Sequence, residues 1–189
     1  MPKVIHIDKT ELWDDVKEEF VYVNEQDIVI EHSLWSIARW EEKYHKAFMV
    51  EKNKTNEELL DYIRIMTLND VDPSVYNKLT TRTLKEIDAY MNDPMTATTF
   101  SKEEQEKLKK GGIDDSFVTS EIVYYWMTAQ NIPFDPCEHW HINKLITLVK
   151  VCSIKNAPDD KKKKKMTSSD LAARRAMMQA RRAQYHTNG

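Results

Sequence analysis

The stretch from residue 117 to residue 156 constrains the fold most, because its hydrophobic residues recur at helical spacing through two successive segments. In the first segment we expect a helix that Ser120 caps at its N-terminus. Asn131 and Pro133 end this helix. Its apolar side carries Ile122, Val123, Trp126 and Met127.

A second helix is expected to begin within residues 135–138. Asp135 is the predicted N-cap, Pro136 takes the first helical position, and Glu138 completes a pair that resembles a capping box. Its wide apolar side consists of His141, Ile142, Leu145, Ile146, Leu148, Val149 and Cys152. Such a wide stripe is typical of a core, so we expect the rest of the chain to pack around this helical hairpin.

Glycine is scarce, with three residues in a chain of 189, two of them adjacent at positions 111 and 112. Glycine-rich phosphate loops need several Gly at fixed spacing, so nucleotide binding through such a loop is excluded. The hydrophobic fraction of 41% and the aromatic fraction of 10% argue against disorder for most of the chain. We therefore expect one globular domain with an appendage.

Neither a membrane span nor a disulfide is indicated. No apolar run approaches the roughly 18 residues of a membrane span, and the N-terminus lacks the long apolar region of a signal peptide. Cys137 and Cys152 lie on one predicted helix, whose rise would separate them by roughly 22 Å. We expect reduced thiols in an intracellular protein.

Charge is distributed unevenly along the chain. Residues 161–189 contain five Lys and four Arg against one Asp, a net charge of +8. Because the whole chain carries −3, residues 1–160 carry −11. The sequence thus predicts an acidic body, residues 1–157, followed by a basic tail, residues 158–189.

The first 32 residues predict a small β element. Residues 3–7 alternate between apolar and polar, and residues 20–23 and 28–30 are β-branched or aromatic runs. We expect residues 24–27, between the last two runs, to form a hairpin turn. Two or three short strands are marginally stable alone, so they should pack against a helix.

Capping signals predict further helices between residues 33 and 110. Ser33 caps a strong helix that we expect to run to about Met49. The others are a helix after a Thr55–Glu58 capping box, a helix that holds Leu84, Ile87 and Met91, and a short exposed helix after Ser101 and Glu104.

The basic tail begins with five consecutive Lys at residues 161–165, which repel one another and should stay extended. Residues 168–185 are rich in Ala, Met and Arg and predict a helix. One face of this helix is lined by Arg174, Arg175, Arg181 and Arg182. The predicted fold is thus mainly α, a helical body with a small N-terminal β element and a C-terminal basic helix on a lysine-rich linker.

The sequence contains no clear catalytic or metal-binding signature. Cys137, His139 and His141 are close in sequence, but residues two apart on a helix point to nearly opposite sides. Two ligands alone do not complete a structural zinc site. Nothing marks either Cys as an activated thiolate, and solvated helix ends explain the adjacent acidic residues. We expect a non-enzymatic protein with no cofactor and no metal.

The basic tail and two tryptophans are the candidate contacts with a partner. The tail suits either an acidic protein surface or nucleic-acid phosphates, and a protein is favoured because Tyr185 is its only aromatic residue for base stacking. A tail that only solubilises the chain is a third alternative. The candidate contact residues are Arg174, Arg175, Arg181, Arg182, Trp35 and Trp40, with core packing as the alternative for the two tryptophans.

Several segments together resemble one family. They are LWSIARWE at residues 34–41, EIVYYWM at 121–127, WHINKLI at 140–146 and VCSIKN at 151–156, followed by the Arg-rich terminal segment. In this order they resemble the tail assembly chaperones of long-tailed, siphovirus-type bacteriophages, small proteins encoded near the tail genes. The resemblance covers the chain from about residue 33 to its end.

The resemblance implies a non-enzymatic role in the host cytoplasm. Tail assembly chaperones bind the tape measure protein, a very long helical chain, and keep it soluble until the tail tube polymerises around it. Covering such a chain takes many copies, which implies either self-association as a homo-oligomer or regular spacing of the copies along the chain. A longer frameshifted product is also typical of the family. The alternatives are a structural component of the virion tail or neck and a nucleic-acid-binding accessory protein that uses the basic tail.

Overall fold

The computed structural model describes residues 2–14, 16, 18–113, 118–156, 172, 174–179 and 181. Its contacts divide the chain into two compact units, Met1–Lys155 and Asn156–Gly189. The fold is mainly helical with a small antiparallel β element at the N-terminus, as predicted. The elements are β1 (Lys3–Ile7), β2 (Thr10–Asp14), β3 (Glu19–Val23), β4 (Gln26–Ile30), α1 (Leu34–Tyr44), α2 (Asn56–Met66), the 3₁₀ helix η1 (Pro73–Lys78), α3 (Thr81–Met91), α4 (Lys102–Lys110), α5 (Ser120–Ala129), the 3₁₀ helix η2 (Cys137–His139) and α6 (Ile142–Asn156).

The four strands form two consecutive two-stranded antiparallel sheets, which together we call the ribbon. β1 pairs with β4, where Lys3 lies opposite Ile30, and β2 pairs with β3, where Trp13 lies opposite Phe20. The residue numbers of partners add to 33 in both ladders, so the two pairs keep a single register across the interruptions at residues 8–9 and 24–25. The ribbon therefore turns between β2 and β3.

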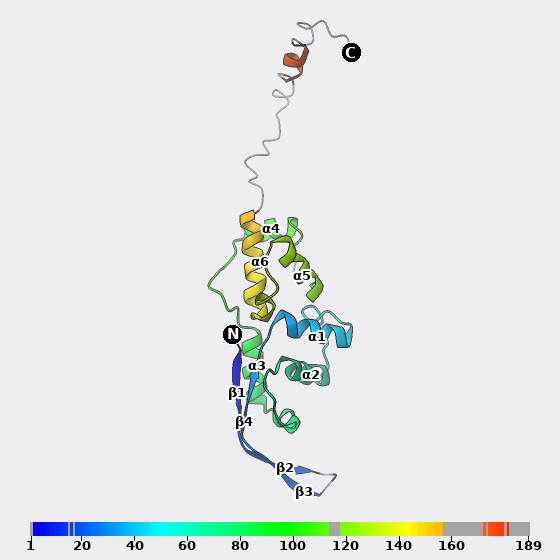
Figure 1. Cartoon of the computed structure of the whole chain (residues 1–189), viewed down its shortest axis with the longest axis vertical. Helices are drawn as coiled ribbons and strands as arrows, with labels where there is room; N and C mark the ends of the chain where they lie inside the picture. Colours follow the sequence, from blue (N-terminus) through cyan, green and yellow to red (C-terminus); the bar gives the residue numbers. More distant parts are fainter. Residues whose placement is uncertain are drawn as a thin grey trace. The chain divides into compact units, whose positions relative to one another are not determined.

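The predicted hairpin turn at residues 24–27 is wrong. Gln26 and Asp27 belong to β4, and the two runs that were expected to pair with each other pair with β1 and β2 instead. The reason is burial of one ribbon face. Pairing β1 with β4 gathers four buried side chains on that face, namely Ile5, Ile7, Ile28 and Ile30. Helix α3 contacts β1, and Figure 1 shows β2 and β3 projecting beyond the helices.

Helix α1 begins where the sequence predicts and ends earlier. Ser33 is its N-cap, and a reciprocal capping box joins Ser33 to Ser36, with the Ser33 N–H donating to Ser36 Oγ at 3.0 Å. The helix ends at Tyr44 instead of Met49, because His45 adopts a left-handed conformation with φ of 53°. The His45 N–H then closes the helix on the Glu41 carbonyl.

Trp40 lies at the centre of the core, so its candidate role as an exposed partner contact is wrong. Its side chain is fully buried, and its indole N–H donates to the Glu58 carbonyl of α2 at 3.0 Å. Its ring packs against Tyr44 and Phe48, with centroid distances of 4.9 and 5.0 Å. Large aromatic burial of this kind joins α1 to α2.

The predicted capping boxes of α2 and α4 are also confirmed. Thr55 and Glu58 form the capping box of α2, and Ser101 and Glu104 form that of α4. Thr80 caps α3 through the N–H of Thr83. The capping residues thereby fix the first turn of each of these helices.

Two buried histidines hold the ends of several elements together. His32 Nδ1 lies 2.6 Å from the Tyr62 hydroxyl of α2, and His141 Nε2 lies 3.0 Å from the Tyr90 carbonyl of α3. The two imidazole rings meet edge to face with centroids 5.1 Å apart. The Ile142 N–H donates to the His32 carbonyl at 2.9 Å, which ties the start of α6 to the segment before α1.

Helix α6 begins at Ile142, so its predicted start at Asp135-Pro136 is wrong. Only the short η2 forms near there, and His141 pairs with Ser33 in an isolated β-bridge. Because the backbone at 141 and 142 is bonded to residues 32 and 33, helical geometry begins only after this bridge. Cys137 and Cys152 thus lie on different elements, both as free thiols.

Helix α5 lacks the predicted Ser120 cap. Thr119 occupies the N-cap position without a side-chain capping bond, and Ser120 is the first helical residue. The Ser120 N–H donates instead to the Glu41 carboxylate of α1, with an N–Oε2 distance of 2.7 Å. A residue distant in sequence therefore supplies the cap.

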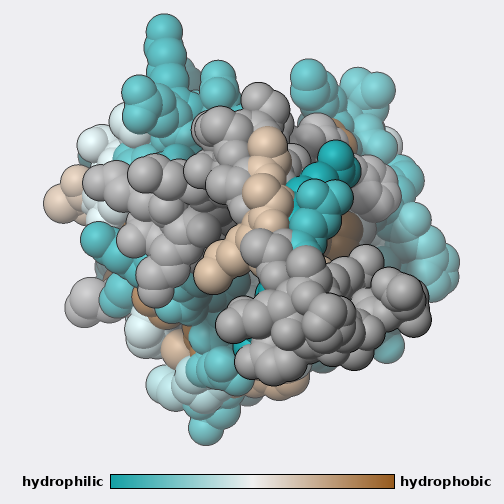
Figure 2. Space-filling view, turned by 90° about the horizontal axis from the view of Figure 1, so that it is seen from above, coloured by the Kyte–Doolittle hydropathy of each residue, from teal (hydrophilic) through white to brown (hydrophobic). Residues whose placement is uncertain are grey.

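The described surface visible in Figure 2 is mostly hydrophilic, with hydrophobic residues scattered between charged ones. Within the described ranges, no helix has the length and apolar character that crossing a membrane requires.

Candidate functional site

An apolar groove lies between α2, η1 and α3. Its volume is about 530 Å³, within the usual size range of binding sites. The lining residues are Asn56, Leu59, Leu60, Tyr62, Ile63, Tyr76, Asn77, Leu79, Leu84, Ile87, Asp88 and Met91. Nine of these side chains are aliphatic, aromatic or Met, and only Asp88 carries a charge, so the groove suits an apolar ligand.

The apolar stripes of two helices create this groove. On α2 the side chain of Ile63 is buried, and on α3 that of Ile87 is buried, so both contribute to the core. Leu59 and Leu84 lie on the same two helices but remain 40% and 39% exposed. An α-helix needs neighbours across its whole apolar stripe, and here part of each stripe is left open.

A second hollow continues the groove toward α6. It has a volume of about 540 Å³ and shares Leu59, Asp88 and Met91 with the first. Its other lining residues are His32, Phe48, Met49, Lys54, Asn92, Val118, Ile142, Asn143, Ile146 and Lys150. We call the two hollows together the α2–α3 groove. Met at positions 49 and 91 makes its lining adaptable, because the Met side chain adjusts to irregular shapes.

Charged groups stand among the apolar residues of this second hollow. Lys54 Nζ lies 4.5 Å from the centroid of the Phe48 ring, and burial lowers the pKa of Lys54. Asp88 from α3 lines both hollows. An occupant with an apolar stripe and charged flanks therefore matches the groove.

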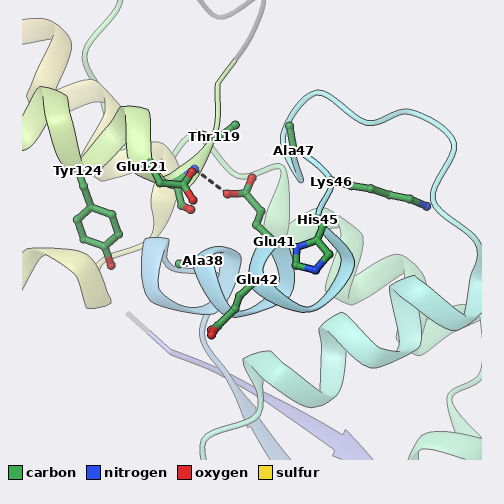
Figure 3. Close-up of a pocket in the computed structure, with 10 residues that line it drawn as sticks. Ala38, Glu41, Glu42, His45, Lys46, Ala47, Thr119, Glu121 and Tyr124 are labelled. Atoms are coloured by element: carbon green, nitrogen blue, oxygen red, sulfur yellow. Dashed lines mark hydrogen bonds between the residues drawn. The ribbon is translucent and has the colours of Figure 1, made fainter.

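A third hollow, between α1 and α5, is larger but has a structural explanation. It measures about 700 Å³ and is lined by Glu41, Glu42, His45, Lys46 and Glu121, among others (Figure 3). Both carboxylate oxygens of Glu41 are already bonded, Oε1 to the Phe48 N–H at 2.8 Å and Oε2 to the Ser120 N–H at 2.7 Å. The most buried acid of this hollow thus holds the fold together.

The buried histidines have the electrostatics of neutral, structural groups. Burial, and then the nearby His141, lowers the pKa of His32 to about 3. Burial also lowers the pKa of His141, whose Nε2–H donates to Tyr90 while its Nδ1 accepts the Asn143 N–H at 3.3 Å. Both nitrogens of neutral His141 are thereby used.

The Cys137, His139 and His141 group does not converge on one point. His141 is buried against Tyr90, whereas His139 is exposed and its Nδ1 lies 3.1 Å from Glu31 Oε1. Cys137 is buried, and burial raises the pKa of its thiol. Among the residues that the structure describes, no three His, Cys, Asp or Glu side chains are placed to hold a metal ion.

The sequence-predicted contact residues have different surroundings. Trp35 is half-buried, with its ring 5.6 Å from that of His139 and with the Arg39 guanidinium 4.5 Å from its centroid. Trp40 is in the core, as described above. Arg174, Arg175 and Arg181 are exposed, and Arg182 lies outside the described residues.

Sequence reasoning missed the open part of the groove. The sequence predicts both helices and the apolar residues Leu84, Ile87 and Met91 of α3, but periodicity does not show which apolar residues another element covers. One available signal is the width of the α2 stripe, where Leu59 and Leu60 are adjacent and cannot both face one neighbouring helix.

Comparison of the chain with protein-family models, with curated proteins and with solved structures gave no match.

Proposed function

We propose that this protein is a non-enzymatic assembly chaperone that covers the apolar stripe of a long helical chain, as a tail assembly chaperone covers the tape measure protein. The observation that carries the proposal is the α2–α3 groove with its partly exposed Leu59 and Leu84. The family resemblance of residues 34–41, 121–127, 140–146 and 151–156 points to the same role.

The groove suits a helix better than a compact small molecule. It runs over two joined hollows, and apolar residues recur along it from Leu84 to Ile146. A helix inserts side chains spaced three and four residues apart into such a groove, and polar residues at the rim fix its register. A helix with an uncovered apolar stripe aggregates, so this contact keeps the partner soluble.

The basic tail supplies the second part of the proposal. We assign residues 168–185 as a basic helix on a lysine-rich linker, and the helical, exposed residues 174–179 support this assignment. Arg174, Arg175, Arg181 and Arg182 then hold acidic residues that flank the partner's apolar stripe. Contact with nucleic acid through the same arginines is the competing outcome.

The test is a pull-down of the tagged, full-length protein from cells that express it with its neighbouring genes, read by mass spectrometry. The groove variant is Leu59→Glu/Leu84→Glu, which places two charges among the apolar lining residues. The matched control is Leu68→Glu, since Leu68 is 49% exposed and is not among the groove residues. A truncation after residue 160 tests the tail.

We expect wild type and Leu68→Glu to recover one very long helical protein, and the groove variant to recover less than about a tenth as much, because a buried charge in an apolar contact costs more than 1.4 kcal/mol. Equal recovery by the groove variant would refute docking in the groove. Recovery that nuclease abolishes, or virion components in fixed ratio, would refute the chaperone role itself.

A further inference from the structure

The outer half of the ribbon presents aromatic side chains to solvent. Trp13 on β2 and Phe20 and Tyr22 on β3 are 52%, 57% and 64% exposed. The rings of Trp13 and Phe20, which are cross-strand partners, meet edge to face with centroids 5.0 Å apart. Pairs of this kind stabilise a ribbon locally but leave much of each ring accessible.

These aromatics continue the face that is buried nearer the helices. In β1 and β4 the buried residues are odd-numbered on the first strand and even-numbered on the second, as Ile5 and Ile28 show. Trp13 and Phe20 follow the same alternation in the same register. The core-forming face of the ribbon thus extends past the last helix that covers it, and there it carries aromatic residues.

The net charge of the ribbon end indicates which kind of segment can cover this face. Residues 10–23 contain five acidic residues and one Lys, a net charge of −4. Two such ribbon ends packed face to face would bring −4 against −4, so a second ribbon is a poor occupant. The face instead matches a basic segment that also carries apolar side chains.

The chain itself contains such a segment at its C-terminus. Residues 174–179 are helical and exposed, and they combine Arg174 and Arg175 with Met177 and Met178. Arginine stacks on aromatic rings, and the Met thioether also contacts ring edges favourably. The fold already uses such contacts, with the Arg39 guanidinium 4.5 Å from the Trp35 ring centroid and Arg64 5.3 Å from that of Tyr76.

We propose that the aromatic ribbon end of one copy binds the basic C-terminal segment of a second copy. The two contacting surfaces differ, so the contact is head to tail and repeats from copy to copy. The inference needs only this chain and stands apart from the groove, although a row of linked copies is what covering a long helix requires.

The size of the contact predicts its strength. An aromatic side chain buries about 150–250 Å², so the exposed portions of the three rings offer roughly 250–450 Å². This is below the roughly 800 Å² per partner of a standard stable interface. The association is therefore weak and reversible, and it strengthens at low salt because opposite charges meet.

The test is analytical ultracentrifugation of the nuclease-treated, full-length protein over a range of concentrations. The ribbon variant is Trp13→Thr/Phe20→Thr, which keeps residues that favour strands. The tail variant replaces Arg174, Arg175, Arg181 and Arg182 by Gln. The control is Val4→Thr, since Val4 is 55% exposed and, at an even position of β1, lies on the opposite face of the ribbon. Circular dichroism checks that each variant folds.

We expect the sedimentation coefficient of wild type and of Val4→Thr to rise with concentration, and each contact variant alone to stay monomeric. An equimolar mixture of the two contact variants retains one intact contact, the tail of one with the ribbon of the other. It should form a species of two chains and nothing larger. A monomeric wild type, a tail variant that associates like wild type, or a monomeric mixture would each overturn the proposal, whether or not the groove binds a helical partner.

Discussion

The carboxylate of Glu41 on α1 accepts the backbone N–H of Ser120 at the start of α5, across 79 positions of sequence and at an N–O distance of 2.7 Å. Its other oxygen accepts the Phe48 N–H at 2.8 Å. One buried acid thus caps a distant helix and holds the loop that follows its own helix. The negative charge also lies at the N-terminus of α5, where the helix dipole favours it.

Replacement of this acid is the first prediction. Glu41→Gln retains the shape but turns one acceptor into an amide donor that faces an N–H. We expect a loss of roughly 1.5–3 kcal/mol in the free energy of unfolding, the usual value of hydrogen bonds to a charged group. Urea denaturation measures it. Glu42→Gln, one residue on and exposed, should change stability by less than about 0.5 kcal/mol.

Acid should destabilise the fold through His32. Its folded pKa of about 3 lies below the roughly 6.5 of an unfolded His, so between these values only the unfolded state binds the proton. The stabilisation is complete above pH of about 6.5 and is lost as the pH falls, at about 1.4 kcal/mol per pH unit for this group.

Urea denaturation across pH 7 to 4 tests this dependence. His32→Asn should be less stable at neutral pH, because Tyr62 loses its imidazole partner, and should show a shallower decline with acid. His45→Asn removes an exposed histidine instead and should keep the wild-type slope. If the stability of wild type and of His32→Asn fell equally steeply with acid, protonation of His32 would not be the cause of the acid sensitivity.

The two tryptophans of α1 should respond very differently to truncation. Trp40→Ala removes a fully buried ring and leaves a cavity, which costs about 3–5 kcal/mol. Trp35→Ala loses mainly its stacking with Arg39 and His139, worth about 1 kcal/mol. Thermal or urea unfolding of both variants gives the comparison, and similar losses would show that Trp35 is more deeply packed than described.

Hydrogen exchange should divide the ribbon into two halves. The amides of β1 and β4 are covered by packed isoleucines, whereas β2 and β3 carry the exposed Trp13, Phe20 and Tyr22. We expect exchange in the outer half to be at least about tenfold faster. Mass spectrometry of peptides from each strand measures it, and uniform protection would mean that another surface covers the outer half.

Local signals in the sequence predicted the starts of α1, α2 and α4. A capping box is decided by residues three positions apart, so Thr55 with Glu58 and Ser101 with Glu104 could be identified without any tertiary information. The buried side of α5, with Val123, Trp126 and Met127, followed in the same way from helical periodicity.

Features that depend on partners distant in sequence could not be predicted. The start of α6 is set by the bridge between His141 and Ser33, which overrides the capping pattern at Asp135. The cap of α5 comes from Glu41, and the pairing of β1 with β4 is decided by which face helices cover. The groove is open for a related reason, since Leu59 and Leu84 look like core residues until the packing around them is known.

The single register of the ribbon makes its length adjustable. Because cross-strand partners add to 33 throughout, deleting residues 11–12 together with their partners 21–22 removes two matched pairs and leaves every remaining pair in place. Each such step shortens the ribbon by about 7 Å without moving any isoleucine off the core. The distance between the aromatic ribbon end and the helices can therefore be changed in steps, by selection or by design, without changing the stability of the body.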